Sequence, residues 1–240
     1  MKTLISYGIW NKQDMIEWLL EGISECVPAD HDVLFMFDNC IDNSIVNFEN
    51  AITKYPNRKW FKKVFDSEVH EIHMHNEALN YLITYNYDCT VVFQDDMRLL
   101  SPLKFNYPTN RLGLVGGRDG YEFNHSEMCS SEWSESNQED QVRYKPYKFI
   151  EKSFLNCGPI FYFNNTIKKV GFLDESFKHF YAWDDLCCRC LDIGLVNGLW
   201  TTDIEHRKFG RVLRSTYYDN DAGSLDRLLL AKKNPRYWAF

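Results

Sequence analysis

Two adjacent carboxylates in the first half of the chain have a type and spacing that suggest chemistry. Residues 90–93 (Thr-Val-Val-Phe) form a continuous β-rich run, and Gln94, Asp95 and Asp96 follow it directly. Adjacent carboxylates repel each other unless a cation or hydrogen-bond donors compensate their charge. Hard divalent ions such as Mg²⁺ or Mn²⁺ take carboxylate oxygens and leave positions open for phosphates. The segment therefore suggests a metal–diphosphate site, although a solvated loop after a strand has the same pattern.

A second acidic pair, Asp184 and Asp185, stands between Trp183 and Leu186 in the second half of the chain. A carboxylate that faces a pocket can act as a general base and deprotonate a sugar hydroxyl as that hydroxyl attacks. Asp is also favourable in the first turn of a helix, because it caps backbone amides and complements the helix dipole. The pair is therefore a candidate for catalysis and equally for helix initiation.

Basic residues gather near the C-terminal end of an otherwise acidic chain. The stretch after His206 contains Arg207, Lys208, Arg211 and Arg214. These side chains could neutralise a diphosphate, or they could form a solvated face. A single histidine near a strand end is more often structural than a metal ligand. The stretch therefore allows anion binding without requiring it.

Three further histidines, His70, His73 and His75, lie close together in the sequence. Their spacing is not that of the HExxH zinc motif, because the second histidine comes one residue too early. In an extended segment His73 and His75 would share one strand face, but no third ligand is evident. The cluster therefore gives little support for a zinc site.

Length and composition limit the possible classes of protein. The chain has 240 residues, of which 45% are hydrophobic and 25% charged, and its net charge is −7. These values are typical of one globular domain with a substantial core. The negative charge argues against nucleic acid as a partner and against binding to anionic membranes. No apolar stretch approaches the ~18–20 residues of a membrane span, and we expect no transmembrane anchor.

The eight cysteines show no spacing typical of a disulfide framework or of a structural zinc site. We therefore expect reduced, mostly buried thiols and a cytoplasmic protein.

Apolar runs and helical periodicity alternate along the chain. The expected strands are residues 3–10, 33–37, 59–65, 90–93, 112–117 and 154–163. The expected helices lie within residues 12–26, 43–54, 76–85, 174–195 and 224–232. This order predicts an α/β fold in a single domain, with a mostly parallel central sheet and helices on both faces. Ligands of such sheets bind at the carboxyl ends of strands, where Asp38 and the pair Asp95-Asp96 fall.

We expect the domain to span residues 1–220, with a nucleotide-binding half (1–100) and an acceptor half (101–220) that includes a polar loop at 118–150. Residues 221–240 are expected to form a C-terminal helix and tail.

Taken in order, these segments resemble inverting, nucleotide-sugar-dependent glycosyltransferases of the GT-A fold, family 2 type. The resemblance runs from about residue 3 to about residue 215. Residues 9–11 (Ile-Trp-Asn) are similar to the family's first strand end beside the nucleobase. Residues 33–38 look like the second strand, whose last Asp contacts the base or ribose. Residues 76–80 resemble the family's Ala-x-x-Asn helix, which packs under the nucleotide. The resemblance therefore implies a nucleotide-binding group that comprises Tyr7, Trp10, Asp38 and Asn80.

The segment Gln94-Asp95-Asp96 looks like the family's DxD motif with the first Asp changed to Gln94. Asp96 keeps the last position, which in the family binds the metal that bridges the sugar diphosphate. Asp95 is then the residue that could supply the ribose contact of the missing first carboxylate. His206 resembles the late histidine that completes metal coordination, and Arg211 belongs to the basic stretch expected near the diphosphate.

The most specific similarity lies in residues 156–163, 170–177 and 183–189. These segments resemble the family's Gly-rich acceptor-side strand, its Gly-Phe-Asp-Glu turn and the start of its Glu-Asp-x-Asp-Leu-x-x-Arg helix. The family's catalytic base lies in that last acidic cluster. The cluster is about a residue shorter here, so the choice between Asp184 and Asp185 stays open.

The resemblance implies a metal-dependent transferase that moves a sugar, with inversion, from a nucleoside-diphosphate sugar to a glycan, glycoprotein or glycolipid hydroxyl. A UDP-sugar is the favoured donor and Mn²⁺ or Mg²⁺ the expected cofactor. Two alternatives stay open. One is a sugar-nucleotide nucleotidyltransferase, although residues 7–12 are not the Gly-rich basic loop usual after the first strand in such enzymes. The other is a non-catalytic glycan-binding protein on the same fold. The sequence does not indicate an oligomeric state.

Overall fold

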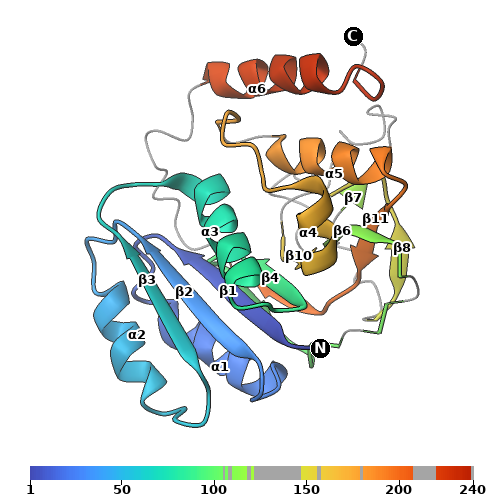
Figure 1. Cartoon of the computed structure of the whole chain (residues 1–240). Helices are drawn as coiled ribbons and strands as arrows, with labels where there is room; N and C mark the ends of the chain where they lie inside the picture. Colours follow the sequence, from blue (N-terminus) through green and yellow to red (C-terminus); the bar gives the residue numbers. More distant parts are fainter. Residues whose placement is uncertain are drawn as a thin grey trace.

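An eight-stranded sheet in the order β3-β2-β1-β4-β10-β6-β11-β8 forms the centre of the molecule (Figure 1). The computed structural model describes residues 1–104, 106–107, 110–117, 120–121, 147–155, 158–178, 181–207 and 220–238. The strands of the central sheet are β1 (Thr3–Ile9), β2 (Asp32–Asp38), β3 (Trp60–Phe65), β4 (Cys89–Phe93), β6 (Leu112–Gly116), β8 (Phe149–Glu151), β10 (Ile160–Phe163) and β11 (Val196–Trp200). Two small ladders pair β5 (Met97–Leu99) with β12 (Ile204–His206), and β7 (Gly120–Tyr121) with β9 (Phe154–Leu155).

The half of the sheet that comes first in the chain is entirely parallel. β1 pairs in parallel with β2 and β4, and β2 pairs in parallel with β3. β10 is antiparallel to both β4 and β6, whereas β6 and β11 are parallel to each other. The mostly parallel sheet predicted from the sequence is therefore confirmed, and β10 and the edge strand β8 are its antiparallel members.

Helices cover both faces of this sheet, as predicted (Figure 1). The helices are α1 (Ile16–Cys26), α2 (Ser44–Ile52), α3 (His70–Thr84), α4 (Asn164–Val170), α5 (Ala182–Asp192) and α6 (Asn220–Lys233). One buried cluster joins the sheet to α1 and α2, and the other joins it to α3, α4 and α5. The boundary predicted at residue 220 stays a prediction, although α6 begins there.

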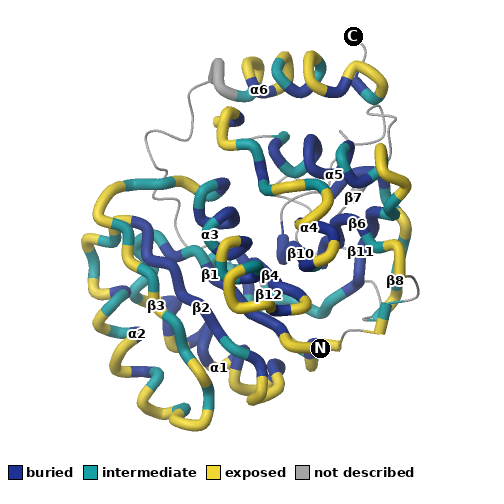
Figure 2. Tube along the Cα trace, in the orientation of Figure 1, coloured by how far each residue is buried: buried dark blue, intermediate teal, exposed yellow. Residues whose placement is uncertain are grey.

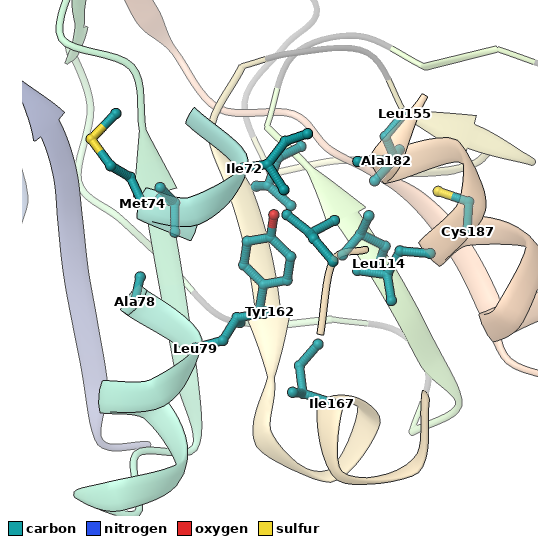
Figure 3. Close-up of a cluster of buried hydrophobic side chains, with 14 of the residues drawn as sticks. Ile72, Met74, Ala78, Leu79, Leu114, Leu155, Tyr162, Ile167, Ala182 and Cys187 are labelled. Carbon is teal, nitrogen blue, oxygen red and sulfur yellow. The ribbon is translucent and has the colours of Figure 1, made fainter. Parts of the chain in front are cut away.

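Alternation along the strands explains how one sheet supplies two cores. Successive strand side chains point to opposite faces. Leu4 of β1 joins the cluster under α3, whereas Ile5 joins the cluster under α1. Because helices cover both sides, the inner strands are buried along their length and appear dark blue in Figure 2. Figure 3 shows the α3 side of this core, where Tyr162 of β10 lies between residues of α3 and α5.

Several predicted boundaries differ from the structure. The histidine cluster is helical rather than extended, because α3 begins at His70. Residues two apart on a helix point in different directions. His75 is therefore buried, whereas His73 is exposed enough to meet Glu175. The strand predicted at 154–163 is two separate strands, β9 and β10.

A buried asparagine joins the sheet to the helices of the second half. The β6–β11 ladder shifts register between Val196 and Gly198, so that β6 carries an extra residue there. Asn197 Oδ1 accepts the Leu114 amide at 2.9 Å, and its Nδ2 donates to the carbonyls of Ser153 and Cys187, each at 3.0 Å. The side chain thus replaces a ladder hydrogen bond that the bulge removes.

Replacing Asn197 with Ala is expected to lower the free energy of unfolding by about 2–4 kcal/mol, because three buried backbone groups lose their partner. Urea denaturation measures this change. The matched control is Asn165→Ala on the exposed side of α4, which should change stability by less than about 0.5 kcal/mol. Equal unfolding midpoints for the two variants would contradict the structural role given to Asn197.

Among the described residues, no helix is long and apolar enough to cross a membrane. The six cysteines in the described part of the chain are free, and all but Cys40 are buried. Cys129 and Cys157 lie outside the described residues. The cytoplasmic location stays a prediction.

Candidate active site

The loops after β1 and β2 are tied to each other at the carboxyl edge of the sheet. Asn11 Oδ1 accepts the Ile41 amide at 2.8 Å, and Ser44 Oγ accepts the Lys12 amide at 2.9 Å. Asn11 and Asn39 adopt left-handed backbone conformations, with φ of 50° and 45°. Asn tolerates this region better than most residues, which allows the chain to turn sharply at each strand end. The two loops therefore form one connected rim beside the acidic strand end of β4.

Asp95 is held by the first of these loops. Its Oδ2 accepts the Trp10 amide at 3.3 Å, and its Oδ1 lies 3.7 Å from Lys12 Nζ. The structure thus brings together Trp10 and Asp95, which the sequence analysis assigned to the nucleotide. The Lys12 ammonium also supplies part of the charge compensation that two adjacent carboxylates require.

Asp96 and His206 are brought together by the small ladder of β5 and β12. His206 is paired with Met97, the residue after Asp96, and the Arg207 amide donates to the Asp96 carbonyl at 2.8 Å. This backbone pairing joins the end of β4 to a segment far along the chain. The backbone of His206, one of the two residues assigned to the metal, therefore lies beside the residue that follows the other, Asp96.

Gln94, at the first position of the DxD-like segment, contacts a carboxylate that sequence reasoning missed. Its Nε2 donates to Glu71 Oε1 at 3.3 Å. Glu71 lies in the first turn of α3, where an acidic residue is usual because of the helix dipole. Only the packing of α3 on β4 shows that this side chain reaches the strand end.

Other residues assigned to the nucleotide have structural surroundings. Tyr7 is buried and stacks on Phe35 and Phe93, with ring centroids 5.3 and 5.0 Å apart. Burial raises the pKa of the Tyr7 hydroxyl. Asp38 is also buried, and its Oδ1 accepts the Val69 amide at 2.8 Å just before α3.

Asn80 is exposed in α3, where its Nδ2 donates to Glu77 Oε2 at 3.3 Å. It lies nine residues after Glu71 along α3. At about 1.5 Å per residue, this separation puts it well over 10 Å from the helix start that reaches Gln94. The nucleotide contacts assigned to Tyr7, Asp38 and Asn80 stay predictions, and Arg211 lies outside the described residues.

The first turn of α5 carries the second acidic pair, and its two carboxylates have different surroundings. Asp185 is 1% exposed and surrounded by donors. Its Oδ2 accepts a hydrogen bond from Arg189 Nε at 2.9 Å, and its Oδ1 accepts one from Asn234 Nδ2 at 3.0 Å. Lys233 Nζ forms an ion pair with the same Oδ1 at 3.0 Å. Asp185 thus joins α5 to the end of α6 and to its own helix. This set of partners is that of a structural ion pair.

Asp184 is also buried, but its Oδ1 has no hydrogen-bond partner among the described residues. Burial, with a smaller contribution from neighbouring Asp185, raises the pKa of Asp184 to about 7. A carboxylate with a pKa near neutrality is suited to accept a proton at physiological pH. The structure therefore separates two residues that the sequence could not distinguish.

The described side chains do not form a metal site by themselves, since no group of three or more His, Cys, Asp or Glu residues converges among them. A divalent ion at this edge would need oxygen atoms from its substrate. Mg²⁺ and related ions commonly bind through one or two carboxylates together with substrate phosphates.

Comparison with known proteins adds evidence about the fold. No family model and no curated protein sequence matches the chain. Solved structures match with probability 1.00. The mannosyltransferase PcManGT from Pyrobaculum calidifontis, in complex with GDP-Man and Mn²⁺, has a TM-score of 0.66 at 11% identity, over 98% of this chain and 64% of that one. S. aureus TarS 1–349 in complex with UDP-GlcNAc has a TM-score of 0.64 at 13% identity, over 97% of this chain and 66% of that one.

GalNAc-T7 with UDP, GalNAc and Mn²⁺ has a TM-score of 0.63 at 8% identity, over 86% of this chain and 44% of that one. The chain thus spans less than two thirds of the length of each of these structures. Together with the central sheet described above, these similarities show that the chain has the GT-A fold of nucleotide-sugar glycosyltransferases. The predicted fold class is confirmed.

Proposed function

We propose that this protein is a metal-dependent, inverting glycosyltransferase that uses a nucleoside-diphosphate sugar, with a UDP-sugar favoured. The acceptor would be a hydroxyl of a glycan, glycoprotein or glycolipid. The observation that carries the proposal is the pairing of β5 with β12, which places the backbone of His206 beside Met97, the residue after Asp96, near the carboxyl end of β4. On a GT-A sheet this is the edge where ligands bind.

The residues at this edge fit a divalent ion bound together with a diphosphate. Asp96 and His206 would hold Mn²⁺ or Mg²⁺, and the remaining positions would be filled by diphosphate oxygens and water. When bound, such an ion neutralises negative charge that develops on the leaving group. The structures of PcManGT and GalNAc-T7 are complexes with Mn²⁺, which supports this choice of cofactor for the same fold.

On the donor side, the chain would orient the nucleotide through the rim of loops after β1 and β2. Trp10 and Asp95 are fixed to each other there, and Lys12 adds a positive charge beside Asp95. A preorganised rim lowers the entropy that is lost when the donor binds. Residues 118–150 are the proposed acceptor-side loop, of which 118–119 and 122–146 lie outside the described residues.

On the acceptor side, Asp184 would accept the proton of the attacking hydroxyl. The hydroxyl oxygen forms a bond to the anomeric carbon while the bond to the diphosphate oxygen breaks on the opposite face, so the configuration inverts. The proton moves to the Asp184 carboxylate. Asp185 would hold the helix that carries this base in place. The reaction needs no covalent intermediate on the protein.

Thermal unfolding with a panel of UDP, GDP, TDP and CMP, each with and without Mn²⁺, tests the proposal. A ligand that binds only the folded state raises the melting temperature. We expect one nucleotide to give a shift that needs the metal, and Asp96→Asn to abolish the metal-dependent part of it. The matched control is Asp192→Asn, a half-exposed carboxylate at the far end of α5, which should keep the full shift.

The two alternative functions predict different results. A glycan-binding protein would show no nucleotide shift and would retain glycan binding in Asp96→Asn. A nucleotidyltransferase would release pyrophosphate from a nucleoside triphosphate and a sugar phosphate. Either outcome would overturn the proposed transfer reaction. A cytoplasmic location is part of the proposal and is tested by fractionation.

A further inference from the structure

A chain of buried polar contacts connects the β4 strand end to the start of α5. Trp183 Nε1 donates to the Tyr162 hydroxyl at 2.8 Å, and this hydroxyl lies 2.7 Å from His75 Nδ1. His75 Nε2 lies 3.8 Å from Glu71 Oε1, which also accepts the Gln94 side chain. We call Glu71, His75, Tyr162 and Trp183 the α3–α5 relay. None of the roles assigned above uses His75, Tyr162 or Trp183.

The hydrogen bond between Trp183 and Tyr162 has a defined direction. An indole N–H can only donate, so the Tyr162 oxygen accepts from Trp183. The Tyr162 oxygen has a second lone pair, so in its contact with His75 Nδ1 the hydroxyl donates or accepts according to the histidine tautomer. Burial lowers the pKa of His75 to about 3, so the ring is neutral. Tyr162 thus forms hydrogen bonds with both Trp183 and His75.

The start of α5 meets the relay at Trp183. Tyr181, the residue before the helix, has a left-handed backbone with φ of 64°, and its side chain makes no capping hydrogen bond. A left-handed conformation is unfavourable for a residue with a Cβ and persists only where its surroundings fix it. The Trp183 indole is packed edge-on against His75, with ring centroids 5.0 Å apart. The relay thus contacts the helix turn that also contains Asp184.

We propose that the Tyr162 hydroxyl is a positioning group that orients the first turn of α5, and hence Asp184, relative to the donor-binding end of β4. This inference rests on the proposed function, in which Asp184 is the base. Tyr162 itself is fully buried in the apolar cluster between α3 and α5 (Figure 3). Its hydroxyl forms hydrogen bonds with His75 of α3 and with Trp183 of α5.

The proposal has a specific kinetic consequence. Loss of the hydroxyl leaves the Trp183 N–H and the His75 Nδ1 without their buried partner, and unpaired buried groups drive a local rearrangement. Small misplacements of a catalytic group reduce turnover strongly, whereas donor binding depends on the separate rim of loops. Tyr162→Phe is therefore expected to lower kcat about ten- to hundredfold and to leave the donor Kd unchanged.

Tyr237→Phe is the matched control. It removes another tyrosine hydroxyl that contacts α5, because Tyr237 donates to Asp192 Oδ1 at 2.8 Å at the opposite end of the helix. This variant should keep both kcat and donor Kd. Trp183→Phe removes the other partner of the same hydrogen bond, and we expect it to lower kcat as Tyr162→Phe does. The double variant should be no slower than the worse single variant, because both changes break one contact.

A readout without substrate separates this inference from the proposed function. Hydrogen exchange of the Trp183 indole N–H, followed by NMR, should speed up at least tenfold in Tyr162→Phe and stay unchanged in Tyr237→Phe. Unchanged exchange, or equal losses of kcat and donor affinity, would overturn the positioning role. If Tyr162→Phe does not fold, kcat and donor Kd of Trp183→Phe test the same contact. An inactive wild-type protein with the expected exchange pattern would instead refute the transferase proposal and the role for Asp184, but not the contact itself.

Discussion

Replacing Asp184 by asparagine is expected to lower kcat by about 10²–10⁴-fold while the affinity for the nucleotide donor stays unchanged. Asparagine keeps the shape of the side chain but cannot accept the proton of the attacking hydroxyl. Single-turnover kinetics and donor titration measure the two quantities separately. The matched control is Asp192→Asn at the other end of α5, which should keep the wild-type rate.

The pH dependence of the wild-type rate should reflect the same group. The base works only when ionised, and burial raises the pKa of Asp184 to about 7. The rate kcat should therefore rise with pH up to about 7 and level off above it. A profile that is flat between pH 5 and pH 8 would contradict this assignment.

As the pH rises, the stability that Asp184 contributes should fall while the rate of the reaction increases. The pKa of Asp184 is raised from 3.8 in the unfolded chain to about 7 in the folded protein, so the folded state holds the proton more tightly. The contribution of Asp184 to the free energy of unfolding is fully present below pH 4 and is lost as the pH rises through about 7. At pH 8, Asp184→Asn should therefore be more stable than the wild type, by an amount on the order of a few kcal/mol. Below pH 4 this difference should vanish.

Removing Asp185 should instead destabilise the protein, by about 3–5 kcal/mol for Asp185→Ala. The carboxylate is 1% exposed and neutralises Arg189 and Lys233, and it also accepts the Asn234 amide. Removing one member of a buried ion pair leaves the partner charge without compensation. Arg189 in turn donates to the carbonyls of Val170 and Phe172, so the loss should extend to the end of α4.

Urea denaturation at pH 7 measures this loss, and limited proteolysis should show cleavage within α6 first. A double-mutant cycle with Asn234→Ala should be non-additive, because Asn234 donates to the same carboxylate. If Asp185→Asn were stable but inactive, while Asp184→Asn kept its activity, the roles given to the two residues would be reversed.

The sequence by itself determined much of the fold. The continuous apolar runs at 33–37 and 90–93 predicted strands covered on both faces, and β2 and β4 are buried in this way. Helical periodicity predicted the helices that cover both faces of the sheet. These features are readable because burial on a sheet or a helix imposes a period on nearby residues. The acidic strand end at Asp95-Asp96 could be predicted because it directly follows the apolar run at 90–93.

Other features depended on contacts between segments far apart in the chain. The sequence predicted a helix only from residue 76, but α3 begins at His70 and contains all three histidines, because short polar stretches have no period strong enough to distinguish strand from helix. Glu71 was not among the predicted site residues, and only the packing of α3 shows that it reaches Gln94. Local sequence contains no information about that approach.

The acidic pair of α5 shows most clearly what only the tertiary structure decided. Asp184 and Asp185 are the same residue type in adjacent positions, so the sequence assigned them one shared role. Adjacent helix positions point about 100° apart, and each side chain therefore meets a different environment. Asp185 faces the donors Arg189, Lys233 and Asn234, whereas burial without such donors raises the pKa of Asp184. The difference between a structural carboxylate and a candidate base thus comes from α6, a helix almost fifty residues further along the chain.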